Sequence, residues 1–494
     1  MDAERDGEGP PTMPQQVGER AAATSTSPPA TPPVGAERDA EGTATMPQQV
    51  GERAAATSTN APATPATDAM QRGTAQPERA GAAQPERAGA AQPERAGVSE
   101  PQRAGATEAR RADRPWRRAV LSGLGIFAAN KVGLALVSAF AWVGEKRPNV
   151  TASYIAAQWA AQWDSVWFRD VAKLGYYADP YNAPAAFFPL YPALIRLFTP
   201  LCFGKDWAAA LLVGNLATLG ALIVLFRLTE HEFDKSTAGR TVFYLVAFPT
   251  GFFLTAAYNE GLFIGLMIAS VYCLRKQYWW WAGAFGGLAA FTRSAGILLA
   301  GAFVYEYVRV NRLTLRRNVL AILLIPLGAA GVSAVSLYYY HQPLAFLKAQ
   351  RYWGRHLDWP WAPVLRGFKS LVTRHGLRFG FGDLWVHNLL ELATVLLIVT
   401  TLVLTFVGPW KLRRDQWILP IIGIVLTLLM ISFPSSHQPY PLYSASRLGL
   451  EVFPAFMLLG RLGARPVVDR TLLALFLMQQ GILVAYFVRG GWVA

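Results

Sequence analysis

Asp164 is the residue whose type and setting in this sequence best suit proton transfer. It follows Trp163 and lies three residues before Trp167. A carboxylate among large apolar rings is costly to keep ionised unless polar partners or a function hold it there. A positioned carboxylate can act as a general base that accepts the proton of a hydroxyl group. Asp164 is therefore a candidate catalytic residue, and a non-catalytic aspartate of an outer loop is the alternative.

The stretch around Asp164 predicts one helix of about six turns over 153–175, with Ser153 as N-cap and Gly175 just beyond its end. Its many tryptophans are typical of an amphipathic helix that lies in the membrane interface. Asp170 follows Asp164 by six residues, about 120° around such a helix, so the two carboxylates do not form a close pair. Trp163 and Asp170 are candidate substrate contacts, and for Asp170 an ion pair with Lys173 is the alternative.

The body of the chain is too apolar for a soluble enzyme. Of the 494 residues, 52% are hydrophobic and 16% charged. Apolar runs of spanning length, about 20 residues, recur at 119–143, 207–226, 241–257, 260–274, 318–340, 386–408, 416–433, 448–464 and 470–488. The stretch 278–308 predicts a hairpin of two short segments that turns near Thr292–Ser294. The sequence thus predicts an all-α integral membrane bundle of about 11 crossings, spanning 116–494.

The loop charges predict the orientation of this bundle. By the positive-inside rule, Arg110, Arg111, Arg114, Arg117 and Arg118 keep the N-terminal side in the cytoplasm, and each later inside loop is also basic. Three segments then face outward and are long or polar enough to build a site: 144–206, 341–385 and 434–447. We expect a multi-pass protein of the cell membrane with an extracytoplasmic site. Because the positive excess lies in short loops, it indicates membrane insertion rather than nucleic-acid binding.

Four ionisable residues fall within or near the apolar spans: Lys131, Arg293, Glu391 and Glu451. Each costs on the order of 3 kcal/mol at the bilayer centre unless it is paired or lines a cavity. Internal salt bridges are one interpretation. The other is a cavity in which Lys131 and Arg293 receive a phosphate group and the two glutamates bind acceptor hydroxyls. In the last outer segment, His437 and Arg447 are further candidate substrate contacts.

The outer segment 341–385 is basic and rich in tryptophan, unlike a typical outer loop. Arg351, Trp353 and Arg355 are its candidate substrate-binding residues. Guanidinium groups recognise phosphate oxygens with two parallel hydrogen bonds, so the segment predicts a cradle for an anionic lipid head group. An amphipathic interface segment with an aromatic belt is the equal alternative.

Residues 1–115 predict a disordered, repetitive cytoplasmic tail. They contain no Leu, Ile, Phe, Trp, Tyr or Cys, and the run MPQQVGERAAATST occurs at 13–26 and again at 46–59. Such a composition buries too little apolar surface to offset its ordering entropy. The body has two cysteines, Cys202 and Cys273, without a metal-binding spacing, so neither a disulfide nor a metal site is expected.

Six motifs of the body together resemble the PIG-V-type mannosyltransferases of the GT-C superfamily, which is made of multi-span glycosyltransferases. They are WDSVWFRDVAKLGYY at 163–177, AAFFPLYPALIRL at 185–197, AYNEGLFIGL at 257–266, FTRSAGILL at 291–299, AQRYWGRHLDWPW at 349–361 and SASRLGLEVFPAFMLLG at 444–460. The resemblance covers nearly all of 119–494, in order. It does not extend to the tail.

This resemblance implies a fold, a reaction and a site. PIG-V enzymes add the second mannose in GPI-anchor assembly, and GT-C enzymes similar to this chain invert the stereochemistry of a polyprenyl-phosphate sugar. Asp164 matches the family's candidate catalytic carboxylate, and the FFPLYP block places Tyr191 near the site. No cofactor and no metal are implied. The family's RSNG-like motif is here Arg293-Ser-Ala-Gly296, so no role of the missing Asn is carried over.

The sequence leaves the acceptor and two rival functions open. The acceptor is a glycolipid, a glycan or a protein hydroxyl. The expected partners are a polyprenyl-phosphate sugar donor and membrane lipids, and the sugar is mannose or another lipid-linked sugar. A transporter or flippase of a lipid-linked or small polar substrate would also carry buried charges along its path. It would be expected to show two-half symmetry of hydropathy, which is not evident here. A scaffold that has lost activity is the third reading.

Overall fold

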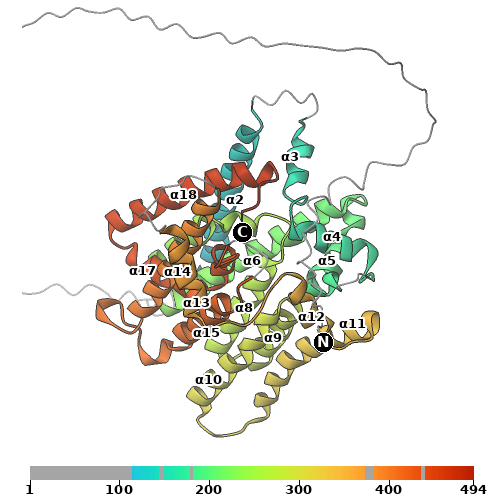
Figure 1. Cartoon of the computed structure of the whole chain (residues 1–494). Coiled ribbons are helices and arrows are strands. Elements are labelled where there is room, and N and C mark those ends of the chain that lie inside the picture. The colour runs from blue at the N-terminus through green and yellow to red at the C-terminus, as the bar shows by residue number, and fades with distance from the viewer. Residues whose placement is uncertain (1–113, 144–149, 179–181, 373–382, 436–439, 494) are drawn as a thin grey trace, which may run out of the picture. The chain divides into compact units, whose positions relative to one another are not determined.

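The computed structural model describes residues 114–143, 150–178, 182–372, 383–435 and 440–493, which form one helical unit (Figure 1). Within these ranges the one extended pairing is an isolated antiparallel bridge between Arg355 and Ser435. The predicted all-α class is therefore confirmed. The predicted tail lies almost wholly outside the described residues, and so does the candidate substrate contact His437.

Five helices of the described ranges are long and apolar enough to cross a membrane. They are α2 (Arg114–Ala141), α6 (Asp206–Glu232), η5 with α11 (Arg317–Leu323 and Leu324–Tyr340), α14 (Asp383–Leu404) and α18 (Pro466–Val488). The apolar helices α15 (Ile418–Ser432) and α17 (Phe453–Leu462) are shorter. The predicted membrane character is confirmed, whereas the count of 11 crossings stays a prediction.

The predicted hairpin at 278–308 is present. Helix α9 (Trp279–Thr292) ends at Arg293, whose backbone is extended, and η4 (Ser294–Leu298) leads into α10 (Leu299–Asn311). Helix α9 lies against α8 (Glu260–Arg275) on one side and α11 on another (Figure 1). A Cβ atom on Gly287 would collide with the carbonyl oxygen of Leu324, so α9 and α11 pack backbone against backbone. This close packing fixes the end of α9, where Arg293 follows.

Ion pairs gather at two ends of the unit, which α8 separates. At the C-terminal end of α8, the buried guanidinium of Arg275 pairs with Glu232 at 2.6 Å and Glu306 at 3.0 Å. These residues belong to loops or helix ends predicted to lie on the cytoplasmic side. Glu260 begins the same helix at the other end, roughly 24 Å away at 1.5 Å per residue. The predicted alternation of loops agrees with this grouping, and the side that faces the cytoplasm stays a prediction.

The first outer segment corrects the prediction of one continuous helix. Helix α3 (Ala152–Gln158) is capped by Thr151 rather than Ser153, and a new helix, α4 (Asp164–Leu174), begins after a break. At the break, the carbonyl oxygen of Trp159 accepts a hydrogen bond from the amide of Ala257 at 2.9 Å. This tertiary bond competes with continuation of the helix. The predicted end at Gly175 is confirmed.

Aromatic packing joins α4 to the segment that follows it. Helix α5 (Leu190–Phe198) lies beside α4 (Figure 1). Phe168 meets Phe187 and Tyr191 edge to face, with ring centroids 5.0 and 5.1 Å apart. Trp167 stacks on Phe187 at 5.6 Å and meets Trp353 edge to face at 5.8 Å. The block at 187–192 thus supports the loop that carries Asp164.

The remaining elements are short and connect the helices above. They are η1 (Ala183–Ala186), η2 (Pro200–Cys202), α7 (Lys235–Ala247), η3 (Gly251–Leu254), α12 (Ala345–Tyr352), α13 (Trp361–Leu371), η6 (Gly408–Trp410), η7 (Arg414–Gln416), α16 (Ala445–Leu448) and η8 (Gly449–Glu451). Cys202 and Cys273 are both free thiols, as expected.

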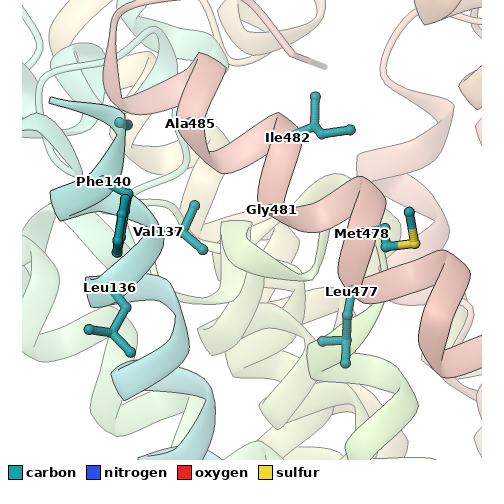
Figure 2. A pocket seen from close by; sticks show the side chains of 9 residues that line it. Leu136, Val137, Phe140, Leu477, Met478, Gly481, Ile482 and Ala485 are labelled. Atoms are coloured by element: carbon teal, nitrogen blue, oxygen red, sulfur yellow. The ribbon is translucent and has the colours of Figure 1, made fainter. Parts of the chain in front are cut away.

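A groove of about 500 Å³ lies between α2 and α18. Figure 2 shows Val137 and Phe140 on the first helix and Leu477 and Ile482 on the second. All its lining residues are apolar, and both helices are candidate membrane spans. The groove is therefore a lipid-facing surface, distinct from the charged residues described next.

Candidate active site

Asp164 opens α4 and carries the carboxylate at the centre of a charged cluster. Its side chain is 28% exposed, and Oδ2 lies 2.8 Å from Nη1 of Arg447. The N-terminus of a helix favours negative charge, so α4 itself stabilises this carboxylate. Trp163, the residue before it, has φ of 49°, which a bulky side chain rarely adopts. The backbone thus turns sharply at the point where Asp164 meets its partner.

Arg447 lies in α16 and connects Asp164 to a buried glutamate. Its Nε is 3.2 Å from Oε1 of Glu260, and its guanidinium lies over the rings of Phe253 and Tyr258, with 5.6 and 5.4 Å to the centroids. Burial acts to lower the pKa of Arg447, but Asp164 and Glu260 outweigh it, and the net shift is upward. Arg447 is therefore a permanent cation.

Glu391 fixes the backbone that carries Arg447. Its carboxylate accepts hydrogen bonds from the amide of Ser446 and, at 3.0 Å, from the hydroxyl of the same serine. Both residues are buried. Because Ser446 directly precedes Arg447, these hydrogen bonds from α14 help to hold Arg447 in place.

Arg293 forms the second half of the cluster. Its Nη1 lies 3.3 Å from Oε1 of Glu260 and 3.1 Å from Oε1 of Glu451. The turn after it depends on Gly296, because a Cβ atom there would overlap the backbone of α9. Of the two sequence interpretations for Arg293 and Glu451, internal salt bridges are thus what the structure contains.

Arg355 brings a third guanidinium, and it has a different environment. Its Nη1 donates to the carbonyl oxygen of Phe433 at 2.8 Å, and its guanidinium lies 5.0 Å from the ring centroid of Tyr443. Burial, followed by the nearby positive charges of Arg447 and Arg293, lowers the pKa of Arg355 to about 10. Over the described ranges, no carboxylate lies within ion-pair distance of Arg355, so its charge is the least compensated of the three.

An aromatic wall stands beside Arg355. Tyr443 stacks on Trp492 with centroids 5.2 Å apart, and Trp492 also stacks on Tyr440 at 4.6 Å. Burial, and next the negative charge of Asp164, raise the pKa of Tyr443, so its phenol stays neutral. The segment that holds Trp492 reaches the break before Asp164, because the carbonyl oxygen of Gly491 accepts from Nε1 of Trp163 at 3.4 Å.

The structure brings together Asp164, Arg293, Arg355 and Arg447 of the predicted site residues, with Glu391 and Glu451 beside them. Trp353 lies at the edge of this group, where its carbonyl oxygen accepts from the hydroxyl of Ser435 at 2.7 Å. Arg351 lies two residues before Trp353, in the last turn of α12, and is exposed.

Three other predicted contacts lie elsewhere. Lys131 of α2 donates to Oγ1 of Thr255 at 2.5 Å. Tyr191 is fully buried, and its hydroxyl donates to the carbonyl oxygen of Ala210 at 2.9 Å. Asp170 lies on α4 near the ion pair of Arg169 with Asp206, and burial raises its pKa. The contacts of Lys131 and Tyr191 lie within the fold, and substrate contact by any of the three residues stays a prediction.

Sequence reasoning missed Glu260, the carboxylate shared by two arginines. It is 1% exposed, and its Oε2 has no hydrogen-bond partner. A signal was available, because Glu260 opens an apolar run and meets the same criterion that singled out Glu391 and Glu451. Tyr258 and Asn259 of the same motif also reach the site. The hydroxyl of Tyr258 donates to the carbonyl oxygen of Gln162 at 3.2 Å, and Asn259 lies 3.4 Å from Arg293.

Comparison with known proteins shows which families and proteins parts of this chain are similar to. Residues 182–339 match the family described as Dolichyl-phosphate-mannose-protein mannosyltransferase. The chain is also 27% identical over 231 residues to GPI mannosyltransferase 2 of Yarrowia lipolytica (strain CLIB 122 / E 150). The resemblance to the PIG-V-type mannosyltransferases is confirmed. The match takes in 46% of this chain and spans about 60% of the length of that relative. The residues matched to the family include Glu260 and Arg293.

Two solved structures are distantly similar to this chain. ArnT from Cupriavidus metallidurans, in a crystal structure with undecaprenyl phosphate, shares 15% identity at a TM-score of 0.45 and covers 74% of this chain and 77% of its own. The oligosaccharyltransferase of Archaeoglobus fulgidus in its apo form shares 12% identity at a TM-score of 0.40. This match covers 75% of this chain and 56% of the oligosaccharyltransferase.

Proposed function

We propose that this chain is a membrane glycosyltransferase that moves a mannosyl residue from a polyprenyl-phosphate donor to a hydroxyl acceptor. One observation carries the proposal: a partly exposed carboxylate, Asp164, stands among Arg293, Arg355 and Arg447 at one end of a helical bundle. The family matched at 182–339 is named for a dolichyl-phosphate-linked mannose, which supports the class of donor.

The chemistry assigned to the cluster needs a base and a set of cations. Asp164 accepts the proton of the acceptor hydroxyl as its oxygen attacks the anomeric carbon. The bond from that carbon to the phosphate oxygen breaks, and the polyprenyl phosphate departs with both electrons. Attack from the face opposite the phosphate inverts the anomeric configuration. Arg355 and Arg447 stabilise the departing charge, since fixed cations in a partly dry site need no reorganisation at that moment.

Tyr443 and Trp492 form an aromatic group beside Arg355, and their rings stack on one another. We assign the sugar to this wall, with its phosphate on the arginines. The acceptor class, whether glycolipid, glycan or protein, is left to experiment.

The side of the membrane follows from the loop charges. Asp164, Arg355 and Arg447 all belong to segments that the positive-inside rule assigns to the extracytoplasmic side. The transporter alternative has less support, because Arg293 is neutralised by Glu260 and Glu451 rather than left along an open path.

A transfer assay separates the two functions. Purified full-length protein is supplied with radiolabelled polyprenyl-phosphate mannose and a panel of membrane glycolipids, glycans and peptides. The proposal requires label in an acceptor and free polyprenyl phosphate in equal amount. Movement of intact donor across a proteoliposome membrane, with no transfer to any acceptor, would instead establish a transporter.

A further inference from the structure

The ion pair between Asp164 and Arg447 occupies both groups, although each has a separate role in the proposed reaction. In the proposed reaction Asp164 has to reach the acceptor hydroxyl, and Arg447 has to reach the donor phosphate. In the structure the two groups hold each other at 2.8 Å. The base and the phosphate-binding cation therefore have to separate before both can act.

The charges of the cluster decide which groups exchange partners. Arg293 is held by two buried carboxylates, those of Glu260 and Glu451. Arg447 is held by Glu260 and by Asp164. Arg447 is thus already paired with two carboxylates, so a phosphate that binds it has to take the place of one of them.

Asp164 is the carboxylate that can leave at least cost. Glu260 and Glu451 are 1% and 5% exposed, and an unpaired carboxylate there would lack water. Asp164 is 28% exposed, so water and the N-terminus of α4 stabilise it after the arginine has gone.

Arg447, by contrast, is held in place. Its guanidinium lies over two aromatic rings, and the preceding residue is anchored by Glu391. Arg355, which no described carboxylate neutralises, lies close enough to Arg447 and Asp164 for both charges to act on its pKa. A phosphate drawn to Arg355 is therefore brought close to the ion pair of Asp164 with Arg447.

We infer that the donor phosphate displaces Asp164 from Arg447 and thereby frees the carboxylate for the acceptor. This inference rests on the proposed function and adds the order in which donor and acceptor bind. Donor binding comes first and releases the base, so an acceptor hydroxyl meets a free carboxylate only when the donor is in place. Arg447 couples the two events, because it pairs with Asp164 before the donor binds and with the donor phosphate afterwards.

The test is a binding measurement that needs no catalysis. Farnesyl phosphate, a short polyprenyl phosphate, is titrated into the full-length protein in detergent, with farnesol as the uncharged comparison. If Asp164 competes with phosphate for Arg447, Asp164→Asn binds farnesyl phosphate more tightly, by roughly tenfold, although the same variant is expected to lose transfer activity. Farnesol binding is expected to stay unchanged.

Asp206→Asn is the matched control. Asp206 pairs with Arg169 at 2.7 Å and is 27% exposed, which closely matches Asp164, but it lies outside the cluster. We expect this variant to bind farnesyl phosphate like the wild type. In an Arg447→Gln background, Asp164→Asn should add less than about twofold, since the arginine they compete for is gone.

Three outcomes overturn the inference. Equal affinity of wild type and Asp164→Asn shows that no competition exists, and an equal gain in the Arg447→Gln background shows a general charge effect; both leave the proposed function standing. Wild-type protein that binds farnesyl phosphate no better than farnesol contradicts the proposed donor class as well. Asp164→Ser repeats the measurement if Asp164→Asn is not monodisperse.

Discussion

Arg293 and Arg447 share a single carboxylate oxygen, Oε1 of Glu260, at 3.3 and 3.2 Å. One arginine follows α9 and the other lies in α16, so the two reach the site from distant parts of the chain. Glu260 therefore links Arg447, which the proposed reaction uses, to the ion pairs of Arg293.

Glu260→Gln tests this arrangement. The amide keeps the shape but removes the charge, so Arg293 and Arg447 each lose one of their two carboxylate partners. We expect the free energy of unfolding to fall by about 1–3 kcal/mol and the transfer rate to fall at least tenfold. Thermal melting and kcat measure the two effects. Wild-type values for both would show that Glu260 does not organise the arginines.

Trp492→Ala tests the aromatic wall. Loss of the stacks on Tyr440 and Tyr443, about 0.5–1.5 kcal/mol each, leaves Tyr443 and Arg355 less well positioned. We expect KM for the donor to rise about tenfold, with a smaller change in kcat. Trp359→Ala is the control, because Trp359 is exposed and stacks on Trp361 away from the cluster. An equal effect of both substitutions would show that the aromatic wall does not contribute to donor binding.

Asp170 gives a prediction for pH dependence. Burial, the largest cause, raises the pKa of its carboxyl in the folded protein above the ordinary value. The folded state therefore binds this proton more tightly than the unfolded state, and the ionised carboxylate costs stability above that pKa. We expect Asp170→Asn to melt at a higher temperature than the wild type at pH 7. The difference should vanish as pH falls below the ordinary pKa of aspartate. A gain that is independent of pH would contradict this cause.

Two exposed positions test the orientation. Phe203, 94% exposed, lies in a segment predicted to face outward, and Leu313, 87% exposed, lies in a loop predicted to face the cytoplasm. In a Cys202→Ser background, Phe203→Cys should react with an impermeant thiol reagent in intact cells. Leu313→Cys should react only after permeabilisation. The reverse pattern would place the cluster on the cytoplasmic side.

The sequence identified most of the charged residues of the cluster but not their pairing. Asp164, Arg293 and Glu451 stood out because an ionised group among apolar residues is costly, and such a setting can be recognised from the sequence alone. Their partners depend on how α8, α9 and α16 meet, which no local pattern encodes. Glu260 was missed although it met the same criterion as the others, and only its sharing between two arginines depends on how the helices meet.

The break in the first outer segment shows a different limit. The residues from Ser153 to Trp163 are compatible with helix, and local preference predicted no interruption. The break follows from a backbone bond between Ala257 and Trp159, whose partners lie far apart in the sequence. The same segment's end at Gly175 was predicted correctly, because a glycine cap is a local signal.

The central claim is that the carboxylate of Asp164 removes the acceptor's proton. The most direct measurement compares transfer of labelled mannose from the polyprenyl-phosphate donor by wild type, Asp164→Asn and Asp206→Asn, each at equal amounts of folded protein. We predict a loss of at least about 10²-fold for Asp164→Asn and a near-normal rate for Asp206→Asn. Full transfer by Asp164→Asn would contradict the account.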